Sequence, residues 1–211
     1  MPGFKAAVPL FAALLLIAAA DRAAFAQLAS DPATIRYVVA PHGNEARYRV
    51  REQLAGIDFP NDAIGKTTLI EGGITVTATG AVIEEESKFT IDLASLTSDK
   101  DRRDGFIKRN TLQTEQYPSA VFVPTRLENL RFPLPQSGDV TFQMLGNLTI
   151  RGVSRPVTWA VTANVANGAL TGEAKTKFTF ADFELEKPRV RSVLSVDDDI
   201  GLEYTFFLVA R

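Results

Sequence analysis

The chain has 211 residues, no cysteine, a single histidine and a formal net charge of −2 at pH 7. The missing cysteine excludes disulfides and thiolate metal ligands, and one histidine leaves almost no scope for a transition-metal site. A nucleic-acid partner is not expected, because such a partner requires a basic protein surface.

The first 26 residues have the pattern of a secretory signal peptide. Lys5 gives a weakly positive start, residues 6–20 form an apolar run, and Ala24-Phe25-Ala26 is a small-residue cleavage motif. The run is too short and too interrupted for a comfortable membrane span, and no later segment is apolar enough to cross a bilayer. We therefore expect cleavage after Ala26 and export to the periplasm.

The remaining residues are expected to form one domain. A mature chain of about 185 residues is long enough to bury roughly 70% of its unfolded surface, so it does not need disulfides. We predict a short disordered lead-in over residues 27–36 and a folded domain over residues 37–211.

Apolar and polar residues alternate along most of this domain, which is the period of a β-strand with one dry and one solvated face. The alternation begins at Tyr37 and is found again over residues 46–50, 74–78, 89–93, 120–125, 140–150, 157–161, 174–180 and 200–208. About eight strands joined by turns that contain Gly, Pro and Asn predict an all-β fold, either an antiparallel sandwich or a barrel.

One segment, between Leu96 and Tyr117, departs from the strand pattern. Ser98 or Asp99 could cap a short helix that runs through Asn110, although Gly105 weakens it. We expect a helical insertion between two strands, lying over a barrel mouth.

The stretch Lys100–Lys108 in this insertion mixes basic, acidic and aromatic residues. Its cations could bind a phosphate or another anionic head group. We favour a solvent-facing helix of mixed charge, because Asp101 and Asp104 lie among the cations.

The dry faces carry unusually large residues, most clearly along residues 140–161. The chain contains 14 phenylalanines, four tyrosines and one tryptophan. These side chains either fill a core completely or line an internal cavity, and an eight-stranded barrel is wide enough to hold a small ligand. The alternation leaves both interpretations open. The candidate lining residues are Phe89, Ile91, Phe122, Phe142, Met144, Trp159, Phe178, Phe180, Tyr204 and Phe206.

No catalytic or metal-binding residues are predicted. His42 lies at a strand start, and no G-x-S-x-G motif accompanies it. The acidic clusters Glu84–Glu86 and Asp197–Asp199 lack the spacing of a calcium loop, so we interpret them as solvated residues, the second in the turn before the last strand.

Five blocks in this order resemble the YceI-like family of secreted polyisoprenoid-binding proteins, and the likeness extends from about Ile35 to Arg211. They are Tyr37–Val50 with Pro41-His42, Phe89–Leu96 followed by Arg103-Asp104, Tyr117-Pro118 followed by Phe122, Gly146–Val153 followed by Arg155-Pro156-Val157, and Asp182-Phe183.

The resemblance implies an eight-stranded antiparallel lipocalin-like β-barrel with a short helical insertion and an elongated apolar pore. It also implies, in many members, a homodimer, and a ligand with a long isoprenoid chain such as a quinone or a polyprenyl compound. In this chain Gly43-Asn44 stands where the family commonly has serine, and Leu112 with Gln113-Thr114 replaces the usual Phe-Asp segment.

Our first hypothesis is therefore a periplasmic carrier or sequestering protein for an isoprenoid or similar amphiphilic lipid, not an enzyme. A second hypothesis is a hydrolase or isomerase that works in the same pocket through His42, Asp92 or Asp182. A third is a structural sandwich whose core is fully packed.

Overall fold

The computed structural model describes residues 33–191 and 193–211. The predicted signal peptide, residues 1–26, lies outside the described residues. Strand β1 (Thr34–Val39) begins inside the predicted lead-in 27–36, so the last residues of that segment belong to the fold.

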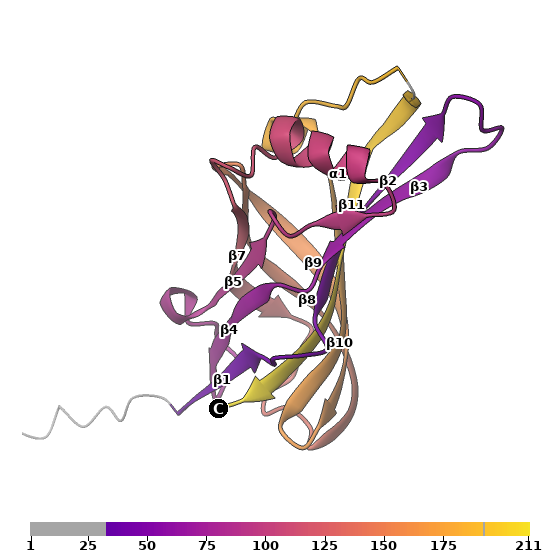
Figure 1. Cartoon of the computed structure of the whole chain (residues 1–211). Helices are drawn as coiled ribbons and strands as arrows, with labels where there is room; N and C mark the ends of the chain where they lie inside the picture. The colour runs from indigo at the N-terminus through magenta and orange to yellow at the C-terminus, as the bar shows by residue number, and fades with distance from the viewer. Residues whose placement is uncertain (1–32, 192) are drawn as a thin grey trace, which may run out of the picture. The chain divides into compact units, whose positions relative to one another are not determined.

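Eight antiparallel strands close into a ring, which confirms the predicted barrel and excludes the sandwich (Figure 1). The ring closes where Tyr37–Val39 of β1 pair with Leu208–Ala210 at the end of the chain. In order around the ring the strands are β1, β4 (Ile70–Thr77), β5 (Lys88–Asp92), β7 (Ser119–Glu128), β8 (Ser137–Ile150), β9 (Val153–Ala166), β10 (Ala169–Thr179) and β11 (Val193–Ala210).

Three further strands extend the sheet from β11, which is 18 residues long and changes partner along its length. Its last residues pair with β1, whereas Val193–Thr205 pair with β2 (Glu45–Leu54). Strand β3 (Asn61–Thr67) follows as a hairpin partner of β2, and the short β6 (Thr97–Ser98) pairs with β3. Strands β2 and β3 therefore extend the barrel wall beside the first part of β11.

The acidic cluster Asp197–Asp199 is part of β11 and not of a turn, which corrects the sequence-based prediction. Its residues lie between Val196 and Ile200, where the pairing with β2 shifts register. Such a bulge places extra residues on one strand, and here all three carboxylates are exposed. Two single-turn 3-10 helices, η1 (Glu84–Glu86) and η3 (Ala181–Phe183), connect other strands.

The predicted helical insertion is present as α1 (Asp101–Phe106), which continues into the π-helical turn η2 (Ile107–Thr111). The N-cap is Lys100, not Ser98 or Asp99. Ser98 has another role: its amide donates to Asp104 Oδ2 at 2.9 Å and its hydroxyl to Asp104 Oδ1 at 2.6 Å. This pair of bonds holds the first turn of the helix against β6. Figure 1 shows the helix at the same end as the β2–β3 hairpin.

Buried side chains fill the interior of the barrel at the end where β1 closes the ring. Alternate residues of its long strands face inward there and are buried, as the alternation predicts. They include Ile74, Val76, Val161, Ala163, Val165, Leu170, Phe206 and Leu208. Among the described residues, no helix is both long enough and apolar enough to span a membrane.

Candidate ligand-binding cavity

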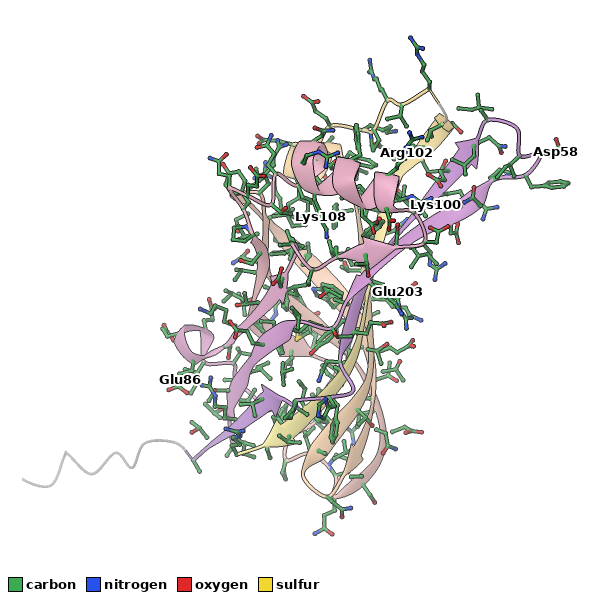
Figure 2. The ribbon with its side chains drawn as sticks, in the orientation of Figure 1. Asp58, Glu86, Lys100, Arg102, Lys108 and Glu203 are labelled. Carbon is green, nitrogen blue, oxygen red and sulfur yellow. The ribbon has the colours of Figure 1, made fainter. Side chains whose placement is uncertain are left out.

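A cavity of about 750 Å³ occupies the half of the barrel that β2, β3 and the helix complete. Pockets of about 300–1,000 Å³ accommodate small-molecule ligands. The wall comprises residues of β2, β3, β4, β5, β7, β8, β9, β10 and β11, with α1, η2 and residues 185–193 around the opening. Figure 2 shows Lys100, Arg102 and Lys108 at the helix and Asp58 at the end of the β2–β3 hairpin.

The structure brings eight of the ten predicted lining residues to this cavity. Their contact with a ligand stays a prediction. They are Phe89, Ile91, Phe122, Met144, Trp159, Phe178, Phe180 and Tyr204.

Phe142 and Phe206 face inward but do not line the cavity. Phe142 is one inward position before Met144 on β8, and Phe206 is one inward position after Tyr204 on β11. Phe206 lies over Gly172, where an added Cβ would come within 3.0 Å of its ring. Both side chains therefore belong to the packed part of the barrel beyond the cavity.

Several lining residues were not predicted, because they come from segments without strand periodicity. Phe106, Ile107 and Leu112 of the helical insertion line the cavity, so α1 is not simply a solvent-facing helix. The sequence feature that could have indicated this is the adjacent apolar pair Phe106-Ile107 within an otherwise charged stretch. Val190, in the segment before β11, likewise contributes, and so does Leu54, the last residue of β2.

Aromatic rings of the wall support one another. The rings of Phe122 and Trp159 meet edge to face with centroids 5.8 Å apart. Those of Phe178 and the fully buried Phe183 meet in the same way at 4.5 Å. Edge-to-face pairs are worth roughly 0.5–1.5 kcal/mol beyond the burial of their area, so these contacts keep the wall in a defined shape.

Tyr204 presents its ring to the cavity while its hydroxyl is bonded elsewhere. The hydroxyl donates to Asn44 Oδ1 at 2.9 Å, and the same oxygen accepts the amide of Phe207 at 3.0 Å. Asn44 in turn donates to the carbonyl of Ala40 at 2.8 Å. Burial raises the pKa of the Tyr204 hydroxyl, which therefore stays neutral. Asn44, part of the Gly43-Asn44 pair that stands where the family commonly has serine, thus holds the β1–β2 turn against β11.

The wall contains one buried ion pair. Arg103 Nη2 of α1 lies 2.6 Å from Glu52 Oε1 of β2, and their side chains are only 14% and 8% exposed. Arg103 also bonds Asp99. The two carboxylates neutralise the arginine, and the pair joins the helix to the wall. Burial also raises the pKa of the neighbouring Tyr48 hydroxyl.

Three wall side chains have a buried polar atom without a hydrogen-bond partner among the described residues. These atoms are Tyr48 Oη, Thr111 Oγ1 and Trp159 Nε1. Each of these three atoms is almost completely inaccessible to solvent. Besides the Arg103–Glu52 pair, the charged residues of the lining are Lys100, Arg102 and Arg109 of the helical insertion, Arg47 of β2 and Glu203 of β11.

The residues named for a catalytic alternative do not line the cavity. His42 is exposed. Asp92 accepts the amide of Ser95 at 3.0 Å, and Asp182 accepts the amide and hydroxyl of Thr179 at 2.7 and 2.8 Å. The Thr179 amide lowers the pKa of Asp182. Both aspartates therefore hold local turns. No group of three or more acidic or histidine side chains in residues 33–191 and 193–211 is arranged to hold a metal ion.

An eight-stranded antiparallel barrel with a helix at one end and an apolar interior cavity defines the lipocalin-like class of barrels. Within this class, the family model described as the YceI-like domain matches residues 37–207, and the chain belongs to that family. The family resemblance predicted from the five sequence blocks is thereby confirmed.

Curated relatives include UPF0312 proteins of Pseudomonas putida F1 and Pseudomonas fluorescens SBW25. Each is 34% identical to this chain over 128 residues, which cover 56% of this chain and 62% of the relative. The matched segment thus spans less than two thirds of the relatives' own length.

Solved structures show the same fold at low sequence identity. A polyisoprenoid-binding domain from Saccharophagus degradans, implicated in plant cell wall breakdown, superposes with a TM-score of 0.61 at 14% identity, covering 86% of this chain and all of that one. Burkholderia cenocepacia BcnA gives 0.57 at 19% identity over 80% and 96% of the two chains. The Campylobacter jejuni YCEI protein gives 0.58 at 20% over 75% and 90%. These similarities establish the fold.

Proposed function

We propose that the protein is a periplasmic binding protein that carries or sequesters an amphiphilic lipid with a long isoprenoid chain, of the quinone or polyprenyl type. The observation that carries this proposal is the cavity of about 750 Å³ with its aromatic and aliphatic wall. Membership of the YceI-like family supports it, and so does the fold shared with a domain described as polyisoprenoid-binding.

The chemistry of the wall favours a long apolar chain. Each methylene moved from water into such a cavity contributes about 0.8 kcal/mol, so ten of them contribute roughly 8 kcal/mol before losses. Association and ordering costs of about 4–15 kcal/mol offset much of this gain. Affinity should therefore rise with chain length until the cavity is full, and short prenyl compounds should bind weakly.

The same wall favours binding over catalysis. Its buried arginine is neutralised by Glu52 and Asp99, and the phenol of Tyr204 is bonded to Asn44. General acid–base catalysis needs a titratable group within reach of the substrate and with a pKa near the working pH. His42, Asp92 and Asp182 lie away from the cavity, so we assign the protein a binding role and propose no reaction.

Ligand extraction tests this proposal. The protein is purified from its own host without detergent, weighed by native mass spectrometry, and extracted with organic solvent. We expect a bound mass of one prenyl lipid or quinone, which denaturation releases into the extract. A clean apo mass together with an extract that contains no such lipid would overturn the proposal.

Location and assembly are tested on the same preparation. We expect the protein in the periplasmic fraction with Gln27 as its first residue, because cleavage is predicted after Ala26. An uncleaved chain in the cytoplasmic fraction would contradict the periplasmic assignment. The homodimer that the resemblance implies stays a prediction, which light scattering measures directly.

A further inference from the structure

Three strongly exposed apolar side chains lie at the end of the barrel where the cavity opens. Phe59 is 78% exposed and Ile57 is 48% exposed, and both are at the tip of the β2–β3 hairpin. Leu194, 67% exposed, lies beside this hairpin because its neighbour Val193 pairs with Leu54. Figure 2 labels Asp58, between Ile57 and Phe59, at the far end of the hairpin. These three side chains are called the apolar tip below.

The apolar tip is continuous with the cavity. Ile57 is half-exposed and also lines the cavity. Leu54 and Ala55 continue the lining inward along β2, and Val190 and Val193 do so from the other side of the opening. An apolar chain could therefore leave the cavity along this path without crossing a polar surface.

Exposed arginines lie on the two segments that border the opening. Arg102 and Arg109 lie on the helical insertion, and Arg189 and Arg191 lie on the segment before β11. None of the four forms a salt bridge with another described residue. By contrast, Arg49 on the outer face of β2 is paired with both Asp62 and Glu203.

Acidic side chains are also present at this end, among them Asp58, Asp99, Asp101, Glu186 and the exposed cluster Asp197–Asp199 of β11. The arrangement is therefore a mixed rim with guanidinium groups beside apolar side chains. Guanidinium groups bind phosphate oxygens well, and amphipathic surfaces of this kind lie at the boundary between lipid head groups and acyl chains.

We propose that this end of the protein docks on a phospholipid bilayer. The apolar tip enters the head-group region, the four arginines contact lipid phosphates, and the opening of the cavity faces the acyl chains. The ligand then passes between bilayer and cavity without crossing water. This inference rests on the proposed function, because an isoprenoid lipid is stored in bilayers.

Vesicle binding tests the docking. The exported chain is sedimented with vesicles of phosphatidylethanolamine and phosphatidylglycerol, and Phe59→Ser/Leu194→Ser is compared with wild type. We expect at least a tenfold weaker partition for the double variant. Arg189→Gln/Arg191→Gln should weaken binding less, and added salt should reduce the difference from wild type. The matched control is Leu69→Ser, since Leu69 is 57% exposed and lies between β3 and β4, away from the tip; its partition should be unchanged.

Ligand transfer is measured in parallel. Trp159 is the only tryptophan and lines the cavity, so a prenylated quinone arriving from vesicles should quench its fluorescence. We expect the double variant to load at least tenfold more slowly and to reach the same final quenching. Native mass spectrometry should find the same bound lipid in both proteins.

The possible outcomes separate the two proposals. Wild type that holds lipid but does not bind vesicles overturns the docking and leaves the proposed function standing. Vesicle binding by a protein that never holds lipid supports docking and overturns the proposed function. Equal loss of partition in Leu69→Ser overturns the docking. A dimer that Phe59→Ser/Leu194→Ser converts to a monomer, without vesicle binding by wild type, assigns the tip to self-association and also overturns it.

Discussion

Phe142 and Met144 are successive inward residues of β8 with different surroundings. Met144 lines the cavity and is paired in register with Trp159, whereas Phe142 packs against the buried core. A ligand therefore competes for space with a larger side chain at position 144 and not with one at position 142. This difference allows ligand binding to be separated from barrel stability on a single strand.

We predict that Met144→Trp abolishes lipid binding while the barrel stays folded. The cavity has room for the indole, so the substitution fills ligand space and does not overpack a dense core. Native mass spectrometry should show at least a tenfold lower occupancy. The control is Phe142→Leu, which should keep full occupancy and lose about 1–2 kcal/mol of unfolding free energy. Normal lipid content in Met144→Trp would show that the ligand lies elsewhere.

At the scale of elements, α1 is joined to the barrel by charge pairing as well as by apolar contact. The Arg103–Glu52 pair spans 51 residues of sequence and is largely buried on both sides. Removal of one partner from such a pair leaves a charge without compensation, whereas replacement of both by apolar groups removes the desolvation cost as well.

Glu52→Gln should therefore destabilise the protein more than a double apolar replacement. We expect the free energy of unfolding of Glu52→Gln to fall by about 1–3 kcal/mol. The loss is smaller than that for a fully unpaired buried charge, because Asp99 still bonds Arg103. Glu52→Leu/Arg103→Met should lose less. Urea unfolding measures both. A double variant at least as unstable as Glu52→Gln would refute this account of the pair.

Asp62 in the β2–β3 hairpin makes a pH-dependent contribution to the free energy of unfolding. Asp62 accepts hydrogen bonds from Arg51 at 3.1 Å and from Arg49 at 3.0 Å. The two guanidinium groups hold the pKa of the Asp62 carboxyl below the usual 3.8. A carboxyl whose pKa is depressed in the folded state stabilises that state above its unfolded pKa. This contribution is lost as the pH falls through the folded pKa.

Asp62→Asn should remove that part of the acid sensitivity. Because the ion pairs of Asp62 with Arg49 and Arg51 are partly exposed, the change in unfolding free energy should not exceed about 1 kcal/mol. The unfolding free energies of wild type and variant are compared at pH 7 and pH 3. The variant should be less stable at pH 7, and the gap should narrow at pH 3. A gap that stays constant with pH would show that the carboxylate charge contributes nothing.

At the scale of the whole molecule, bound lipid is expected to be part of the stability of the barrel. A ligand that binds only the folded state adds about 2.7 kcal/mol when it is present at a hundred times its Kd. For a chain of this length that corresponds to roughly 5–10 °C in Tm. Calorimetry should therefore show a lower Tm after lipid extraction, restored by adding the lipid back. Met144→Trp should show no such restoration, and an equal response in that variant would contradict binding in the cavity.

Much of the fold was predictable, because a strand needs only a local alternation of apolar and polar residues. The alternation over residues 140–150 and 157–161 corresponds to β8 and β9, which pair along their whole length. The five family blocks likewise identified the family that the domain match establishes. The cavity lining was predicted less completely. Phe142 and Phe206 were predicted to line it but pack in or against the core, whereas Phe106 and Ile107 line it and were not predicted.

Strand β3 was not predicted because Asn61, Asp62 and Gly65 are poor strand formers. Gly65 is nevertheless suited to its place, since an added Cβ there would come within 2.2 Å of the Tyr48 ring. That contact exists only after β2 and β3 have paired. Tertiary packing therefore outweighs local propensity in this hairpin.

By itself, the sequence determined which residues face inward in strands with a clear alternation, such as β8 and β9, because side-chain alternation is a local property of the chain. Only the tertiary structure decided that the sheet closes into a barrel, since closure depends on Tyr37–Val39 meeting Leu208–Ala210 at the opposite end of the domain. Only the tertiary structure decided, too, which inward residues border empty space. Met144 and Phe142 have the same pattern along the chain, and the difference between cavity wall and core arises from the strands and the helix that face them.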